Sequence, residues 1–212
     1  MTDDLIARLV RDLKPVPAGA VARLFLFVPV VALLVSATAM LAWLGPRPDF
    51  QQAISMPIFW IKCIYVLLLG ICGTKAMERA GRPGARGGGA FVLAGVVFAA
   101  TAVAAGLDYA QAAPDARHLM LMGSSAIVCP LLIVALSMPF LAAAFLVLRR
   151  LAPTRLGMAG ASAGLMAGGL GAWVYSFHCT EPGLPFLATW YSLGVAAVVI
   201  LGALCGRVLL RW

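Results

Sequence analysis

The chain has 212 residues, of which 63% are hydrophobic and only 11% are charged. A soluble domain carries about 25% charged residues, so this composition excludes a sizeable soluble domain and predicts one membrane domain with short loops. The formal net charge is +8, but the basic residues flank apolar runs and are not interleaved with aromatic residues, so nucleic acid is not an expected direct partner.

The N-terminal segment, residues 1–22, is predicted to contain a short amphipathic helix that ends before Pro15. Its apolar side chains form one helical stripe: Leu5, Ile6, Leu9 and Leu13. Its acidic side chains lie on the polar side: Asp3, Asp4 and Asp12. Such a helix can lie on a membrane surface or dock into a groove on a partner protein. Because carboxylates are repelled by anionic lipid, we favour a cytoplasmic partner.

Six apolar runs follow, at residues 24–44, 58–77, 90–109, 126–148, 156–177 and 186–206. Each is near the roughly 20 residues that cross a hydrocarbon core as a helix, the form that satisfies backbone groups inside a bilayer. The first run is too long for the core of a cleaved signal peptide, which has about 7–15 residues. The sequence therefore predicts an all-α polytopic protein in which residues 23–212 form a six-helix transmembrane domain.

The distribution of Lys and Arg predicts the orientation. Of the 16 such residues, four precede the first run, four lie in the second connection, three in the fourth connection and two at the C-terminus. The opposite connections hold only Arg47 and Arg117. The remaining Lys62 lies near the outer end of the second run, where its side chain is expected to snorkel outward. Because basic residues stay in the cytoplasm, both termini are expected inside a bacterial inner membrane.

The centres of the six runs contain no Asp, Glu, Arg or His. A transporter or proton pump needs ionisable groups at that depth, so this class is disfavoured. The sequence also lacks Cys-x-x-Cys and H-E-x-x-H, and no Gly-Lys-Ser/Thr sequence follows its glycine-rich second connection. We therefore expect neither enzyme activity nor a cofactor.

The fifth run contains three glycines at a spacing of four residues: Gly160, Gly164 and Gly168. This spacing places them on one helical face, where another backbone can approach closely. Packing within the chain is the favoured interpretation, and homo-oligomerisation through the same face is the alternative.

The five cysteines separate by their position along the runs. Cys72 and Cys205 lie in cytoplasmic halves and are expected to be small buried hydrophobes. Cys129 precedes Pro130, which is suited to the first position of a helix, so we place the helix start at Pro130 and Cys129 at the outer mouth. Cys179 follows the fifth run, in a loop that is also outside.

Cys63 also lies towards the outer side, within the second run. The other two outer cysteines, Cys129 and Cys179, leave several chemistries open. Three interpretations are open: a structural disulfide, two unconnected thiols or a reactive pair. The sequence does not choose between them, because it does not reveal which cysteines are connected. The short connection at residues 149–155 favours neighbouring fourth and fifth helices, and we therefore expect the pair to be close enough to bridge. His178 could join Cys129 and Cys179 as a ligand of a soft metal.

Short motifs along the whole chain resemble the NrsF family of membrane anti-sigma factors. They are TDDLI at residues 2–6, DL at 12–13, PVP at 15–17, FWIK at 59–62, CP at 129–130, HC at 178–179, EP at 181–182, TWYSLG at 189–194 and LLRW at 209–212. Thr180 stands where proline is expected in many relatives.

This resemblance implies six membrane helices and the sequestration of an extracytoplasmic-function sigma factor. It places the sensor of oxidants or heavy metals on Cys129 and Cys179. It places sigma-factor binding on the N-terminal segment, at Asp3, Asp4, Leu5, Ile6, Leu9, Asp12 and Leu13. The competing hypothesis is a small thiol oxidoreductase that exchanges electrons with quinone, but the absence of Cys-x-x-Cys disfavours it.

Overall fold

The computed structural model describes residues 20–82, 88–151 and 153–211, and every regular element in these ranges is helical. The long helices are α2 (Ala20–Ala39), α4 (Pro57–Ala80), α5 (Gly88–Gln111), α7 (Val128–Arg149), α8 (Leu156–Ser176) and α10 (Ser192–Leu209). The short ones are η1 (Met40–Leu44), α3 (Phe50–Ala53), α6 (Pro114–Met122), α9 (Leu184–Phe186) and η2 (Leu187–Tyr191). The prediction of an all-α fold is confirmed.

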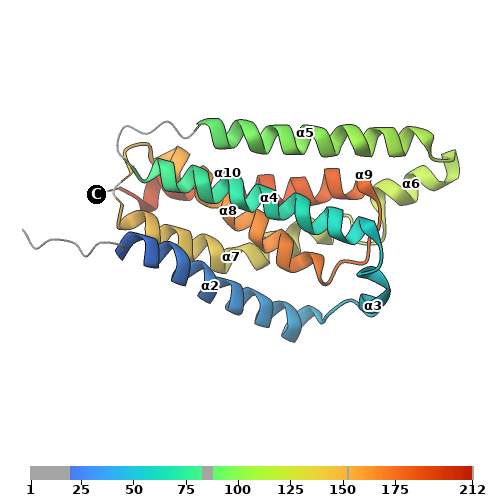
Figure 1. The fold of residues 1–212 in the computed structure, drawn as a ribbon, viewed down its shortest axis with the longest axis horizontal. Helices are drawn as coiled ribbons and strands as arrows, with labels where there is room; N and C mark the ends of the chain where they lie inside the picture. Colours follow the sequence, from blue (N-terminus) through green and yellow to red (C-terminus); the bar gives the residue numbers. More distant parts are fainter. Residues whose placement is uncertain (1–19, 83–87, 152, 212) are drawn as a thin grey trace, which may run out of the picture.

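The long helices run side by side as a bundle (Figure 1). The start of α2 and the C-terminal end of α10 lie at the same end of this bundle, while α3, α6 and α9 lie at the other. We call the latter the distal end. The N-terminal segment with its expected sigma-binding residues lies outside the described ranges.

Among the described residues, five helical stretches are long and apolar enough to cross a membrane: Phe27–Leu44, Pro57–Ala80, Gly88–Gln111, Val128–Arg149 and Leu184–Leu209. They correspond to five of the six predicted runs. The other run forms α8, a helix of 21 residues that is absent from this set. The mean hydropathy of α8 is too low for this set, because the helix contains six glycines and glycine contributes little hydropathy.

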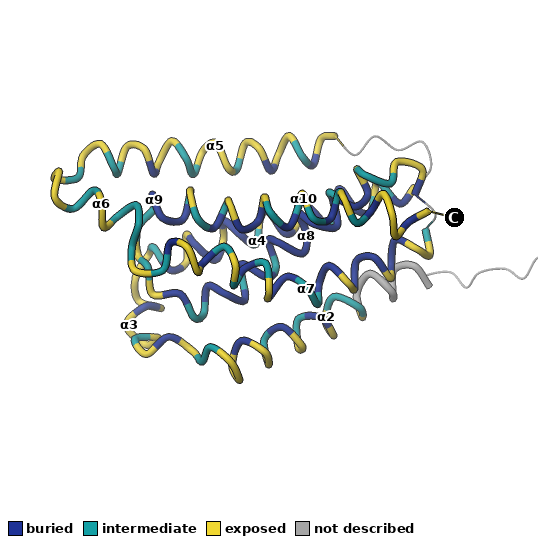
Figure 2. Tube along the Cα trace, turned by 180° about the vertical axis from the view of Figure 1, so that it is seen from behind, coloured by how far each residue is buried: buried dark blue, intermediate teal, exposed yellow. Residues whose placement is uncertain are grey.

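The most enclosed helix is α8, which packs against α4, α7 and α10. Figure 2 shows the contrast between this buried centre and α5, whose surface is largely exposed. On the far side of the bundle α2 packs on α7, where Ser36 donates a buried hydrogen bond of 2.8 Å to the carbonyl of Leu136. The core therefore lies around α8.

Glycines bring the backbones of α8 and α10 into direct contact. A Cβ atom added at Gly160 would lie 2.1 Å from the carbonyl oxygen of Gly202, and one at Gly164 would lie 2.5 Å from that of Val198. Gly168 faces Val195 in the same way. The predicted packing within the chain is therefore what the structure contains. Residues of α10 cover these three glycines, and homo-oligomerisation stays an untested alternative.

Replacing Gly160 by Ala is expected to destabilise the folded protein by about 1–3 kcal/mol, because its methyl group would displace the α10 backbone. Gly95→Ala is a matched control, since nothing lies within 4 Å of a Cβ added at that position in α5. Thermal unfolding of both variants in one detergent measures the difference. Equal midpoints would contradict the close α8–α10 contact.

Candidate functional site

The two predicted sensor cysteines meet at the distal end of the bundle. Cys129 is the second residue of α7, and Cys179 lies in the loop between α8 and α9. Both side chains belong to the main buried cluster, with exposed fractions of 0% and 2%, and both are free thiols. The Lys62 ammonium lies 3.8 Å from the Cys179 Sγ. The fold thus gathers an unbridged pair of thiols and a lysine.

The predicted start of α7 at Pro130 is wrong by two residues. The helix begins at Val128, and the Cys129 amide donates to the carbonyl of Ser125 over 2.8 Å. Proline is tolerated here because amides in the first turn of a helix need no intrahelical partner. Cys129 consequently faces the core, while Ile127 and Val128 face outward, and the thiol is not at an open mouth.

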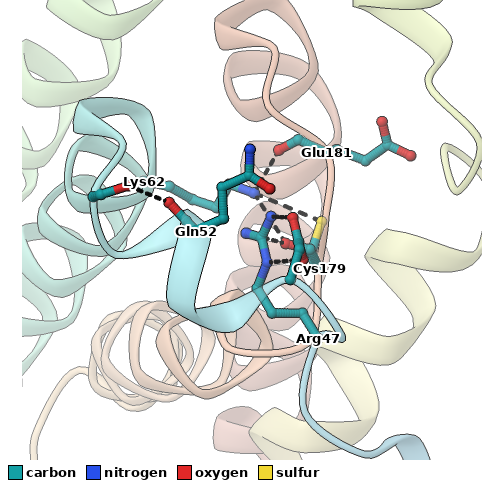
Figure 3. A network of polar contacts seen from close by, with 7 residues as sticks. Arg47, Gln52, Lys62, Cys179 and Glu181 are labelled. Atoms are coloured by element: carbon teal, nitrogen blue, oxygen red, sulfur yellow. Dashed lines mark hydrogen bonds and ion pairs between the residues drawn. The ribbon is translucent and has the colours of Figure 1, made fainter.

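Lys62 does not snorkel out of the bundle as predicted. Its side chain is 2% exposed, and its ammonium donates to the carbonyl oxygens of Glu181 at 2.6 Å and Cys179 at 3.4 Å (Figure 3). The same nitrogen lies 3.8 Å from the Cys179 Sγ and 5.4 Å from the centre of the Tyr191 ring. The carbonyls replace water around the charge, which makes burial of this lysine tolerable.

Arg47 reaches the same loop from the connection that follows η1. Its guanidinium donates to the Cys179 carbonyl over 3.2 Å and makes a paired contact with Asp49, at 2.8 and 2.7 Å. The hydrogen bond from Arg47 holds the pKa of Asp49 below its usual value, and the same bond raises the pKa of Arg47. As the pH falls, Asp49 therefore stays ionised and keeps its contact with Arg47 at the pH where an ordinary aspartate becomes protonated. The contact is lost only at a lower pH.

His178 has a structural contact in this arrangement. Its Nδ1 atom lies 2.9 Å from the carbonyl oxygen of Gly45. Within the described ranges, no group of three His, Cys, Asp or Glu side chains is assembled that could hold a metal ion. The thiols of Cys129 and Cys179 are therefore the soft donors that the site presents.

Two tyrosines complete the site: Tyr175 was not singled out from the sequence, and Tyr191 appeared there only within the TWYSLG motif, with no role assigned. Tyr175 and Tyr191 are 1% and 0% exposed, their ring centres are 5.6 Å apart, and both lie within electrostatic range of the two thiols. The Tyr191 hydroxyl is the buried side-chain polar atom that has no hydrogen-bond partner among the described residues. Tyr191 ends the π-helix η2, a distortion that often marks functional sites, but no sequence signal predicted it.

A separate apolar cavity of about 1000 Å³ lies between α5 and the bundle. Tyr65, Ala94, Phe98, Ala102 and Ser192 are among its lining residues, and no cysteine of the described chain lines it. A partly buried polar contact in its lining joins the hydroxyls of Tyr65 and Ser192 at 2.6 Å. The thiol site and this cavity are therefore distinct.

Comparisons with known proteins agree over the whole chain. A family model described as "Negative regulator of sigma F" (NrsF) matches residues 9–212. The anti-sigma-F factor NrsF of Caulobacter vibrioides is 44% identical over 217 aligned residues, which cover 100% of this chain and 99% of that protein. A probable anti-sigma-F factor NrsF of Azospira oryzae is 35% identical and is covered to the same extent. No solved structure matches the chain.

Proposed function

This chain belongs to the NrsF family, and we propose that it holds an extracytoplasmic-function sigma factor at the bacterial inner membrane and releases it when its outer thiols react. The names of its relatives support an anti-sigma role and a sigma factor of the sigma-F type as partner. Membership of this family supports a regulatory role. The rival oxidoreductase gains no support, since the apolar cavity that could accept a quinone is not lined by cysteine.

The observation that carries the sensing part of this proposal is the buried, unbridged pair Cys129 and Cys179. A two-electron oxidant such as a peroxide can take two electrons and two protons from the pair, which leaves a disulfide. Alternatively, a soft divalent cation can bind both sulfurs with release of two protons. Either product replaces the two S–H groups beside the Lys62 ammonium and the Tyr191 hydroxyl. The reduced state and the reacted state of the site therefore differ in stability.

The arrangement of helices offers a path for the signal. Cys129 lies in the first turn of α7 and Cys179 follows α8, so a change between the thiols acts on two helices that pack against each other. Glycines bring the backbone of α8 into direct contact with those of α4 and α10. Because so little side-chain volume separates them, we expect each helix to shift as a rigid body. Such a shift reaches the opposite end of the bundle, where we place the cytoplasmic face and the N-terminal segment that holds the sigma factor.

Six spans with cytoplasmic termini are part of this proposal. Reporter fusions after Gly84 and Trp212 should give cytoplasmic signals, and fusions after Arg47 and Gly183 should give periplasmic signals, because basic residues are concentrated around the first two positions. The contact between Arg47 and the Cys179 carbonyl supports one common side for the last two. A periplasmic signal at Gly84 would refute the six-span topology.

Affinity purification of the full chain from membranes tests the partner. A sigma factor should co-elute under reducing conditions, and the amount should fall after treatment with peroxide or a soft metal ion. A protein that inserts normally but retains no sigma factor would contradict the proposed function.

A further inference from the structure

Both sensor thiols are closed off from solvent, so a reagent reaches them only when the surrounding segments separate. Each thiol belongs to or adjoins one short segment at the distal end: Cys179 lies in residues 177–183, which we call the Cys179 loop, and Cys129 follows residues 123–127, which we call the Cys129 turn. The contacts between these two segments therefore govern access to the thiols.

The carboxylate of Glu181 joins the two segments. Its Oε1 atom accepts hydrogen bonds from the Ser124 amide at 2.7 Å, the Ser124 hydroxyl at 2.6 Å and the Ser125 hydroxyl at 3.3 Å. Glu181 is two residues from Cys179, and Ser125 is four residues from Cys129. Hydrogen bonds to an ionised acceptor are about twice as strong as neutral ones, so these three bonds hold the two segments together more firmly than neutral ones would.

The backbone of the Cys129 turn is shaped around this carboxylate. Gly123 has a φ of +52°, which side chains rarely adopt, and a Cβ atom there would lie 2.4 Å from the Glu181 Oε2. Nearby, a Cβ atom at Gly183 would lie 2.8 Å from the Met120 carbonyl oxygen, and Trp190 donates to the Leu121 carbonyl over 2.8 Å. Gly123 therefore permits the close approach of the Cys179 loop to the Cys129 turn, and Gly183 permits its close approach to α6.

The other end of Glu181 is also held. Its backbone carbonyl accepts the 2.6 Å hydrogen bond from Lys62 of α4, and the same ammonium contacts the Cys179 carbonyl. Glu181 thus ties the Cys179 loop to α4 through its main chain and to the Cys129 turn through its side chain (Figure 3 shows the Lys62 side).

We propose that Glu181 is a positioning residue of the thiol sensor, a latch that keeps Cys129 and Cys179 together and covered until it opens. This inference rests on the proposed sensing function, since it explains how buried thiols respond at all. Opening the latch separates the Cys129 turn from the Cys179 loop and admits the reagent. The Lys62 contact keeps the loop attached to α4 meanwhile.

Alkylation of the full chain in detergent with N-ethylmaleimide, read for each cysteine by peptide mass spectrometry, tests this. Glu181→Gln keeps the shape but loses the charge and should accelerate labelling of both Cys129 and Cys179 about tenfold. Glu78→Gln is the matched control, because Glu78 pairs with Lys75 and Arg82 at the cytoplasmic end of α4 and should leave the rates unchanged. Cys72 reports whether the whole bundle has loosened.

A second variant provides a coupling measurement. Ser124→Ala should accelerate labelling as well, and in combination with Glu181→Gln it should add little, because both changes break the same contact. Unchanged labelling of Cys129 and Cys179 in both single variants would overturn the latch, as would equal acceleration at Cys72. The latch and the proposed trigger can fail separately. If the variants are labelled faster but the unchanged protein keeps its sigma factor under peroxide, the latch is supported and the proposed trigger is refuted.

Discussion

Replacing Leu5 and Leu9 by Asp should abolish co-elution of the sigma factor while the protein stays in the membrane fraction. Both leucines lie on the apolar stripe of the N-terminal segment, outside the described ranges, and the prediction rests on the sequence pattern. Burying one leucine in a partner groove contributes about 1.5–3 kcal/mol, and about 1.4 kcal/mol is tenfold in affinity. Loss of both contacts therefore weakens binding by about two to four orders of magnitude.

Ala7→Asp is a suitable control for this double variant. It introduces one aspartate into the same segment, where the double variant introduces two, and Ala7 lies off the apolar stripe. Its sigma-factor yield should remain close to that of the unchanged protein. If the Leu5 and Leu9 double variant retained the sigma factor, the segment would be only a membrane-surface anchor, and binding would have to be sought in the cytoplasmic connections.

Serine at Cys129 or Cys179 should abolish release of the sigma factor by peroxide or by a soft metal ion. A hydroxyl forms no disulfide and is a hard, weak ligand, so neither chemistry proceeds when one sulfur is missing. Retention of the sigma factor without stimulus should persist, because the substitution conserves volume and a buried hydroxyl costs at most about 1–3 kcal/mol. Release is measured as the sigma factor remaining on purified membranes before and after treatment.

Cys72→Ser and Cys205→Ser are the controls for the sensor variants, since neither residue lies at the distal end. Both should respond as the unchanged protein does. Peptide mapping after peroxide would also test whether Cys129 and Cys179 bridge directly, which stays a prediction. Full release from the double variant Cys129→Ser and Cys179→Ser would remove the sensor role from this pair.

The helical framework could be predicted from the sequence because its determinants are local. The length of an apolar run and the spacing of glycines are properties of one segment, and they predicted the long helices and the face that α8 turns to α10. The family resemblance could be recognised in the same way, from short motifs in a fixed order. The start of α7 was placed two residues late, since proline fits several positions in the first turn of a helix.

The surroundings of the thiols were decided only by the tertiary structure. Arg47 and Lys62 contact the Cys179 loop across 132 and 117 residues of sequence, and Glu181 contacts Ser124 across 57. Sequence reasoning treated Lys62 as a snorkelling side chain and gave Glu181 no role, because each side chain was considered with its own helix or loop alone. Burial and hydrogen bonding depend instead on which distant segments meet, and that is a property of the packed bundle.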